Sequence, residues 1–576
     1  MQPTWVLFIH AASKWWATVS ALDGLRTIAD LARPQTIRAL KGAGTLSAMS
    51  PVAVSTALPW LLGRGPSLGV LSQMNAVALG NKTAILDRSG RVTFRDLDRM
   101  ANQVAGAIAA AGVAPGEPVA MILRNGREMA AVILGCQKAG FIACPMNTWA
   151  RTKELKATLD NAGPKIVFYD TKHTDSVAGA VSGDACLIAV GEGSGAVPGS
   201  IPFDEFLGSG SGRPPFPFTR RRGSAKIVIH TSGTTGTPRG AQRDAASSGL
   251  GRMAEVLSVV PYRREDVIYC PAPLFHSFGL LTFTMATALG ATLVLPERFD
   301  PEDSLRLIEE HRATAASFVP VMIKRIVEQG EEVRDRYDLS HLRLVMASGS
   351  ALSPDLRAAA AEVFGPVLYD LYGSTEAGWV AIATPEHMAE EPKTVGRLVP
   401  GTEILLLSTD GEELPTGEVG EIHVKSEMIF EGYTSGDNRP FVDGYISIGD
   451  LGRVDDRGYL FVEGRADDMV VVGGENVYPI EIEEVIESLP GVTDAAVTGA
   501  GDPDLGQVLV AYVAGDTTEE KVIAHCKSEL ASYKVPRRVK VMTELPHTST
   551  GKILKRELNL RGGSTIPRRH GPIFHD

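Results

Sequence analysis

The sequence is poor in cysteine and in aromatic residues, and it has no excess of positive charge. It contains five cysteines among 576 residues, and none of them belongs to a CxxC pair. Such scattered cysteines argue against a disulfide framework or a cysteine-based zinc site, and they favour a reducing, cytoplasmic setting. The formal net charge of −11 argues against a protein that binds nucleic acid through overall positive charge.

The sequence also lacks a convincing membrane-spanning run. The longer of two uncharged stretches, residues 267–296, contains Pro271, Pro273 and His276. These residues break the stretch into short apolar runs, which predicts a buried strand, a helix and a second strand instead of a bilayer span. A Gly-x-Ser-x-Gly pattern at residues 65–69 has no strand before it, as a hydrolase nucleophile elbow requires, so a serine hydrolase is not favoured.

What the chain does have is length and an ordinary globular composition, with 44% hydrophobic and 22% charged residues. A chain of this length exceeds one compact core, so we expect several domains. Thr93 is placed to cap a helix whose apolar residues recur at helical spacing. Strand and helix patterns then alternate to about residue 400, which predicts an α/β fold with largely parallel sheets. The Gly/Ser/Pro-rich stretch 191–212 is expected to be a long surface excursion.

Two changes of pattern suggest the domain organisation. A β-rich section follows residue 400, and from Met469 onward the pattern becomes that of a small α+β unit. We therefore expect a basic, tryptophan-rich N-terminal extension over residues 1–70, a large domain over 71–464 and a small C-terminal domain over 465–576. The boundary predicts a hinge near residues 465–468.

The N-terminal segment differs from the rest of the chain in charge. Residues 1–64 carry six Lys or Arg and two Asp, a net charge of +4, together with four of the six tryptophans. Basic residues and amphipathic rings favour the surface of an anionic membrane. One hypothesis is therefore peripheral contact with the inner face of the membrane. The alternative is a helical cap that buries the tryptophans against the large domain.

The strongest motif is HTSGTTGTPRG at residues 230–240, directly after the apolar run that begins at Lys226. Its hydroxyls and glycines can bring side-chain and backbone donors close to phosphate oxygens. No Gly-Lys-Ser/Thr follows at the spacing of a Walker A loop. We predict a phosphate-binding loop of a different kind, made of Thr231, Ser232, Gly233, Thr234, Thr235 and Gly236.

A second motif is LYGSTEAG at residues 371–378, where the hydroxyl of Thr375 precedes the carboxylate of Glu376. Mg²⁺ commonly binds one or two carboxylates and completes its shell with phosphates and water. The pair is therefore a candidate phosphate contact beside a Mg²⁺ ligand. By itself, such a segment would more often be a turn with a surface glutamate.

Three further segments complete a recognisable set: ASGSAL (347–352), SIGDLGRVDDRGYLFVEGRADDMVVVGGENVYPIEIE (447–483) and PHTSTGKILKREL (546–558). With them, residues 70–560 resemble the adenylate-forming, acyl-activating superfamily and, within it, the fatty-acid–CoA ligases. The resemblance implies a large domain of α/β subdomains plus a β-rich subdomain, followed by a small mobile domain. It also implies ATP, Mg²⁺ and the co-substrate CoA. A carboxylate would attack the α-phosphate of ATP to give acyl-AMP and pyrophosphate, and the CoA thiol would then displace AMP.

The resemblance implies roles for individual residues. Asp450 would accept both ribose hydroxyls, and Arg465 would contact ribose and phosphate beside the hinge residue Asp467. His276 would border the acyl pocket, and the alternative is a hydrogen-bonded histidine of the core. Thr375 would lie near the α-phosphate. The turn that approaches the CoA pantetheine would consist of Gly473, Gly474 and Glu475. The adenine and acyl-adenylate slot would be lined by Ser350, Asp370, Leu371, Tyr372, Gly373 and Ser374.

Two basic residues complete the expected site. Lys552 matches the lysine of a mobile loop, and a cation there would stabilise the negative charge that grows on the carboxylate and α-phosphate oxygens during adenylation. The alternative is that Lys552 lies in a solvated turn before a helix. Arg239 stands where the family usually has lysine after the phosphate loop, and a guanidinium can also pair with phosphate.

Several interpretations of the function stay open. The leading one is an ATP- and Mg²⁺-dependent ligase that converts a medium- or long-chain fatty acid into acyl-CoA. A fatty acyl-AMP ligase that serves a carrier protein would need an extra segment, and residues 450–467 look too short to hold one. An aryl or other carboxylate–CoA ligase fits the same motifs. A nucleotide-binding pseudoenzyme is disfavoured because the set of motif residues is intact. Oligomerisation is also left open.

Overall fold

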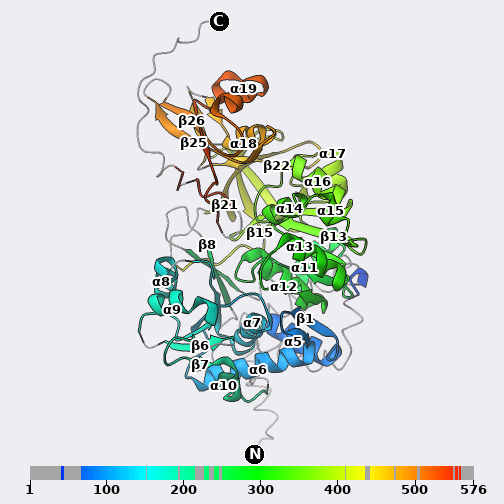
Figure 1. Cartoon of the computed structure of the whole chain (residues 1–576), viewed down its shortest axis with the longest axis vertical. Coiled ribbons are helices and arrows are strands. Elements are labelled where there is room, and N and C mark those ends of the chain that lie inside the picture. Colours follow the sequence, from blue (N-terminus) through cyan, green and yellow to red (C-terminus); the bar gives the residue numbers. More distant parts are fainter. Residues whose placement is uncertain are drawn as a thin grey trace, which may run out of the picture.

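The computed structural model shows a large α/β body with a smaller unit at one end, which carries α18 (Pro479–Glu487) and α19 (Glu519–Glu529) (Figure 1). The residues that the structure describes are 41–44, 67–150, 152–183, 185–191, 195–213, 226–231, 239–244, 250–408, 410–434, 441–466, 468–472, 475–502, 506–548, 552–555 and 557–558.

A nine-stranded sheet forms the centre of the large domain, and its six strands from β14 to β1 run parallel. The strands at its two ends, β15 and β16 on one side and β2 on the other, pair antiparallel with it. In sheet order the strands are β16 (Arg397–Leu398), β15 (Gly378–Ala383), β14 (Leu368–Ser374), β13 (Leu344–Ser348), β12 (Ala315–Phe318), β10 (Val267–Tyr269), β11 (Thr292–Val294), β1 (Thr83–Asp87) and β2 (Gly90–Thr93).

An eight-stranded sheet lies beside it and is parallel except at β9 and β19. All five residues of β5 are buried, as expected for a parallel strand covered on both faces. In sheet order the strands are β19 (Gly432–Tyr433), β9 (Arg239–Asp244), β8 (Lys226–Thr231), β4 (Ile142–Pro145), β3 (Pro118–Ile122), β5 (Ile166–Asp170), β6 (Cys186–Val190) and β7 (Ile201–Pro202).

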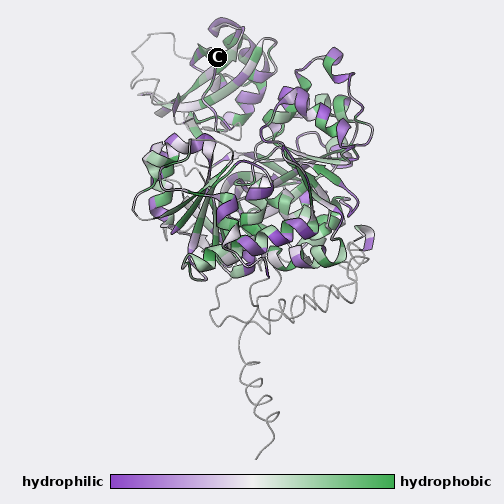
Figure 2. Cartoon of the chain, turned by 60° about the horizontal axis from the view of Figure 1, so that its bottom comes forward, coloured by the Kyte–Doolittle hydropathy of each residue, from purple (hydrophilic) through white to green (hydrophobic). Residues whose placement is uncertain are grey.

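Helices cover these two sheets, and Figure 2 shows hydrophilic residues on the outward faces of helices that enclose hydrophobic strands. Thr93 caps the second helix as predicted, because its side chain accepts a hydrogen bond from Asp96 N at 3.1 Å. The helices of the large domain are α5 (Leu68–Ala78), α6 (Phe94–Ala110), α7 (Arg127–Ala139), α8 (Thr152–Ala162), α9 (Thr174–Ala180), α10 (Phe203–Gly208), α11 (Leu250–Val259), α12 (Ser277–Leu289), α13 (Pro301–Glu310), α14 (Pro320–Val327), α15 (Glu331–Arg334), α16 (Pro354–Phe364) and α17 (Pro385–Glu390).

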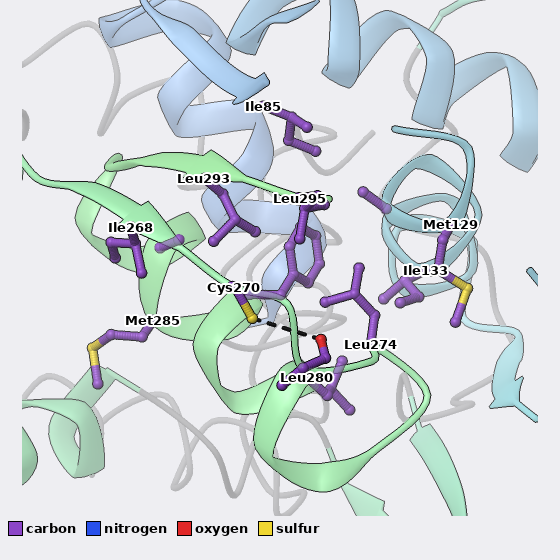
Figure 3. Packing of buried hydrophobic residues seen from close by; sticks show 14 of the residues in the cluster. Ile85, Met129, Ile133, Ile268, Cys270, Leu274, Leu280, Met285, Leu293 and Leu295 are labelled. Atoms are coloured by element: carbon purple, nitrogen blue, oxygen red, sulfur yellow. Dashed lines mark hydrogen bonds between the residues drawn. The ribbon is translucent and has the colours of Figure 1, made fainter. Parts of the chain in front are cut away.

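The core joins the two sheets. One buried cluster includes Ile85 of β1 in the nine-stranded sheet and Val119 of β3 in the eight-stranded sheet. Figure 3 shows part of this cluster, with Ile85, Ile133 of α7 and Leu280 of α12 among its side chains. The predicted strand, helix and second strand over residues 267–296 are confirmed as β10, α12 and β11. Among the residues that the structure describes, no helix has both the length and the apolar character that crossing a bilayer requires.

Two segments differ from the expectation. The stretch 191–212, expected to be a surface excursion, contains β7 and α10 and buries Phe203 and Phe206 against Phe168, with ring centroids 6.2 and 5.5 Å apart. The many glycines and serines of the stretch predicted a loop, whereas its two phenylalanines anchor it in the core. Ser67 is the cap of α5, accepting from Val70 N at 3.4 Å, and Ala43 is buried in the same core. Part of the expected N-terminal extension therefore packs on the large domain.

The β-rich section expected after residue 400 forms an antiparallel sheet with the order β17-β18-β21-β20, and β22 pairs with β21. It buries its own apolar cluster, which includes Ile422, Val424 and Ile446. The strands are β17 (Glu403–Leu407), β18 (Gly420–Lys425), β20 (Phe441–Val442), β21 (Tyr445–Val454) and β22 (Leu460–Arg465).

The small C-terminal unit has a separate sheet and a separate core. Helices α18 and α19 pack on the sheet, and Ile482, Ile486 and Val522 are buried between them. Its sheet has the order β24-β23-β26-β25, and β27 pairs with β26. The strands are β23 (Val470–Val472), β24 (Glu475–Val477), β25 (Val492–Asp502), β26 (Gly506–Gly515) and β27 (Arg538–Met542).

Candidate active site

The predicted phosphate loop connects two paired strands. Thr231 ends β8 and Arg239 begins β9, and the two residues are register partners in an antiparallel pair. The pairing of β8 with β9 therefore holds the two ends of the loop next to each other. Loop residues Ser232, Gly233, Thr234, Thr235 and Gly236 lie outside the described residues, so their predicted role stays a prediction.

His230 stands directly before this loop, and sequence reasoning gave it no role. Burial lowers the pKa of His230 to about 4, so the ring is neutral at pH 7. In the described part of the chain neither ring nitrogen has a hydrogen-bond partner. The ring thus contributes no charge to the base of the loop.

Glu376 lies in the turn between β14 and β15 and is held from two sides. Its backbone N–H donates to Ser374 Oγ at 3.2 Å, and its carbonyl accepts from Phe430 N at 2.8 Å. Its Oε1 accepts a hydrogen bond from the hydroxyl of Tyr433. One carboxylate oxygen is thereby fixed, which suits a residue that offers its other oxygen to a cation.

Tyr433 was missed by sequence reasoning. It belongs to β19. This strand pairs with β9, the strand that follows the phosphate loop, and Tyr433 lies opposite Ala241. The contact with Glu376 joins residues 57 positions apart. The pairing of β19 with β9 and the bond from Phe430 N to the carbonyl of Glu376 bring them together, and the Gly-Tyr dipeptide carries no local signal of either contact.

Asp450 is the best-defined carboxylate of the site. It is the register partner of Arg465 on β21 and β22, and Arg465 Nη1 lies 2.8 Å from Asp450 Oδ1. Asp450 Oδ2 accepts from the hydroxyl of Tyr372 on β14 at 2.7 Å. Arg465 also donates to the carbonyl of Ile448 at 3.2 Å. The structure therefore brings together three residues that the sequence nominated separately.

The environment of Tyr372 supports this geometry. Burial raises the pKa of the Tyr372 hydroxyl, and the charge of Asp450 raises it further, so the tyrosine stays a hydrogen-bond donor. The side chain of Asp450 is 14% exposed. Its carboxylate is a preorganised acceptor with two oxygens, the feature that pairing with a ribose diol requires.

The remaining slot residues lie at the carboxyl ends of adjacent parallel strands. Ser350 follows β13 and is exposed, and Leu371 and Gly373 lie on the neighbouring strand β14. Ligands of open α/β sheets bind at this edge. Ser348 Oγ donates to the carbonyl of Leu371 at 2.8 Å and fixes the two strand ends.

Asp370 has a partner that the sequence did not indicate. Its carboxylate pairs with Arg357 of α16 at 2.8 Å, and both side chains are 7% exposed. Arg357 also donates to the carbonyls of Pro392 and Thr394. The side chain of Asp370 thus holds α16 and the segment before β16, and its backbone is paired with β13 on one side and β15 on the other.

His276 borders a group of aromatic rings. It precedes α12, and burial lowers the pKa of His276 to about 4. Its ring centroid lies 6.1 Å from that of Phe275, which in turn meets Trp149 edge-on at 5.3 Å. Trp149 is 53% exposed. Sequence reasoning did not single out Phe275, which contacts a residue expected at the acyl pocket, or Trp149, which contacts Phe275.

Lys552 is the small-domain residue that the sequence predicts for the site. Its side chain is exposed, while its N–H donates to Thr548 Oγ1 at 3.0 Å and its carbonyl accepts from Thr548 N at 2.7 Å. The bridge between His547 and Ile553 closes this short hairpin. Glu475 begins β24, whereas Gly473, Gly474 and the expected hinge residue Asp467 lie outside the described residues, so their roles stay predictions.

With this geometry in place, comparison with known proteins identifies the family. Residues 73–434 match the family of AMP-binding enzymes, and residues 481–552 match the AMP-binding enzyme C-terminal domain. The chain belongs to this adenylate-forming family, and the predicted superfamily is confirmed. Its α/β fold with a separate C-terminal domain is that of the family's solved structures.

Three relatives illustrate the match. The long-chain-fatty-acid–CoA ligase FadD13 of Mycobacterium tuberculosis is 30% identical over 83% of this chain and 94% of its own length. The fatty acid–[acyl-carrier-protein] ligase ScoC of Streptomyces coeruleorubidus is 30% identical over 83% of this chain and 93% of its own. The ATP-bound structure of MatB from Rhodopseudomonas palustris is 28% identical, with a TM-score of 0.75 over 84% of this chain and 96% of that one.

These findings define the class of enzyme. The protein is an AMP-forming acid–thiol ligase that activates a carboxylate by adenylation, and such CoA ligases use ATP, Mg²⁺ and CoA. The fixed acceptor at Asp450 and the carboxylate of Glu376, which Tyr433 holds through one oxygen, fit a nucleotide with its cation. The relatives differ both in the acid and in the acyl acceptor that their names give, so the identity of each is a separate question.

Proposed function

We propose that the protein converts a medium- or long-chain fatty acid into acyl-AMP and then into acyl-CoA. The observation that carries the adenylation step is the group formed by Asp450, Arg465 and Tyr372, which presents a fixed carboxylate at the carboxyl edge of the nine-stranded sheet. The hydroxyls of a ribose would pair with the two oxygens of Asp450. Arg465 would add a donor for the ribose or the α-phosphate.

The phosphates of ATP would lie between the loop 231–236 and the turn that carries Thr375 and Glu376. Mg²⁺ bound to Glu376 would neutralise phosphate charge, and Tyr433 would keep the carboxylate aimed at it. Arg239, at the foot of the loop, would pair with phosphate through a guanidinium instead of the lysine usual in the family.

Adenylation and thioester formation would use different parts of the small domain. In the first step the acid's oxygen bonds to the α-phosphorus, the bond to the β-phosphate oxygen breaks, and Lys552 stabilises the charge on the reacting oxygens. In the second step the thiol sulfur of CoA bonds to the acyl carbon and AMP leaves. We propose that Gly473, Gly474 and Glu475 border the pantetheine in that step and that the chain rotates at Asp467 between the steps.

A fatty acyl tail would lie against the rings near His276. Burial leaves His276 uncharged, and the half-exposed Trp149 extends the apolar surface from the buried Phe275. The similarity to FadD13, a long-chain-fatty-acid–CoA ligase, supports an alkyl tail. Aromatic faces would also accept an aryl acid, so an aryl–CoA ligase is the competing assignment.

The experiment is a panel of carboxylates, from acetate to long-chain fatty acids and with aromatic acids included, each scored by pyrophosphate release. We expect the highest kcat/KM with medium or long alkyl chains and thioester only when CoA is added. Trp149→Ala should raise KM for long chains and leave acetate unchanged. A higher kcat/KM for an aromatic acid would contradict the fatty-acid assignment.

A carrier protein is the second candidate acceptor, because ScoC is as similar to this chain as FadD13 is. Against it, β21 and β22 are joined by a short turn, in which Asp455 accepts from Arg457 N at 3.0 Å, and β22 ends at Arg465. The described residues 441–466 thus hold no extra segment. Thioester formation on CoA in the absence of any carrier protein separates the two acceptors.

We further propose that the N-terminal segment gives peripheral contact with an anionic membrane, where a fatty acid would dissolve. Residues 1–40 lie outside the described residues and contain four Lys or Arg, two Asp and three tryptophans. Residues 41–44 belong to the large domain instead, since Ala43 is buried and its carbonyl accepts from Arg264 N at 2.9 Å. A deletion that tests the membrane contact should therefore end at residue 40.

A further inference from the structure

The segment that follows Lys552 is bound to the small domain by apolar and polar contacts. Leu558 is fully buried and Ile553 partly buried in a cluster with Leu545 and Tyr512. Leu554 N donates to the carbonyl of Pro546 at 2.7 Å. These contacts hold the segment on the sheet of the small domain. None of them connects it to the expected hinge at residues 465–468.

Lys555 connects the segment to the region of the expected hinge. Its Nζ lies 2.8 Å from Glu483 Oε1 on α18 and 3.5 Å from Asp468 Oδ2. Glu483 is also fixed, because its Oε1 accepts from Val497 N on β25 at 2.6 Å. Burial lowers the pKa of Lys555, but the charges of Glu483 and Asp468 outweigh this and raise it, so the lysine is charged.

Asp468 places this contact beside the boundary between the domains. Asp468 N donates to the carbonyl of Arg465 at 3.2 Å, and Met469 N donates to the same carbonyl at 3.1 Å. Arg465 in turn pairs with Asp450. A chain of contacts therefore leads from the ribose carboxylate, through the turn after β22, to the segment that carries Lys552.

We infer that Lys555 is a positioning residue, which fixes the Lys552 segment against α18 and the start of the small domain so that Lys552 reaches the reacting oxygens during adenylation. This inference rests on the proposed function and deepens it. Both carboxylates that hold Lys555 follow the expected hinge in the chain, so the contact turns with the small domain as a unit. Its loss should thus affect the step that uses Lys552 and spare the other.

The test compares half-reactions in the full-length protein. Lys555→Met should slow acyl-AMP formation roughly 10- to 100-fold, since a small misplacement of a catalytic group can cost about 100-fold. Thioester formation from supplied acyl-AMP should stay within about twofold of wild type. Lys555→Arg, which keeps the charge, should restore adenylation. Lys534→Met is the matched control, because Lys534 pairs with Glu481 on the same helix at 2.6 Å.

Two double variants exclude simpler explanations. Lys555→Met leaves Glu483 buried without its cation, and Glu483→Gln in the same chain removes that charge. Positioning predicts that this double variant stays slow, whereas recovery would mean that the unpaired charge was the cause and would overturn the inference. In a Lys552→Ala background Lys555→Met should slow adenylation no further, because the group that it positions is already gone. Additive losses, or equal losses in both half-reactions, would also overturn it.

A readout that needs no turnover separates this inference from the proposed function. Amide hydrogen exchange at Lys552 and Leu554, both bonded in the wild type, should be faster in Lys555→Met and unchanged in Lys534→Met. Unchanged exchange would overturn the positioning role whatever the substrate is. A wild-type enzyme that released no pyrophosphate with any fatty acid would instead contradict the proposed function.

Discussion

The two parts of the proposed active site are built differently. On the large domain, Asp450 is held by Tyr372 and Arg465, and Glu376 by Tyr433, so both carboxylates are oriented by the protein itself. On the small domain, the side chain of Lys552 is exposed and only its backbone is pinned. Preorganised groups stabilise charge without reorganisation, whereas an exposed cation must be brought to its place.

Two polar contacts between the domains are exposed, unlike those that hold Asp450. Lys393 of the large domain pairs with Glu484 of α18 at 3.0 Å, but the lysine side chain is 67% exposed. Lys324 of α14 donates to the carbonyl of Thr493, another exposed contact. Exposed ion pairs contribute about 0–1 kcal/mol each. If Asp450, Glu376 and Lys552 act as proposed, the nucleotide site is preorganised within the large domain, whereas Lys552 must be positioned through contacts with exposed side chains.

Lys552→Ala should produce the largest effect and separate the two parts. We expect acyl-AMP formation to fall by about 10²–10³, equal to about 2.7–4 kcal/mol, because one charge-stabilising contact is lost. Thioester formation from supplied acyl-AMP should be preserved. Single-turnover measurements of each half-reaction check this, and equal losses in both would reject the role of Lys552.

His276→Gln tests the burial of His276 in the large domain through the pH dependence of protein stability. Because burial lowers the pKa of His276 to about 4, the folded protein binds fewer protons than the unfolded chain between about pH 4 and 6.5. The stability that this confers is present above pH 6.5 and is lost as the pH falls toward 4. From pH 7 to 4.5 the wild type should lose on the order of 2 kcal/mol more than the variant in urea unfolding. Equal losses would show that His276 is already hydrated.

Tyr433→Phe should have a smaller effect, because it removes one hydrogen bond to Glu376 and keeps the ring. We expect pyrophosphate release at limiting Mg²⁺ to fall roughly tenfold, in line with about 1.5 kcal/mol for a bond to a charged group. Excess Mg²⁺ should recover part of the rate. Tyr445→Phe is the control, because its hydroxyl bonds Glu403 at 3.0 Å on an exposed part of the β-rich sheet. An unchanged Mg²⁺ dependence in Tyr433→Phe would contradict the positioning of Glu376.

Deleting residues 1–40 should have the smallest effect on catalysis. It tests the N-terminal segment, which lies outside both parts of the proposed active site. We expect normal turnover of a soluble short-chain acid but no co-sedimentation with anionic liposomes at low salt, where each basic residue near the surface contributes about 1 kcal/mol. If the truncated protein still sediments, or if the full-length protein never does, the membrane proposal fails and the helical cap is favoured.

The sequence determined the local structure and the order of the motifs. Thr93 and the apolar spacing after it predict α6, and the broken uncharged stretch predicts β10, α12 and β11. The buried strand before the phosphate loop, the Thr375–Glu376 turn and the hairpin residue Lys552 could all be named from the chain. Helix caps, periodicity and turns depend on neighbours within a few residues, and so they can be predicted without the fold.

The tertiary structure decided which side chains meet. Asp370 looks like the other slot residues in sequence, yet its carboxylate is taken by Arg357. Glu376 obtained its orienting partner from β19, 57 residues further on, and Asp450 obtained Tyr372 from another sheet, 78 residues before it. Such pairs depend on strand order and register, which arise when separate segments bury their apolar faces together. A short motif contains no information about that packing, so the chemistry could be named from the sequence while its positioning could not.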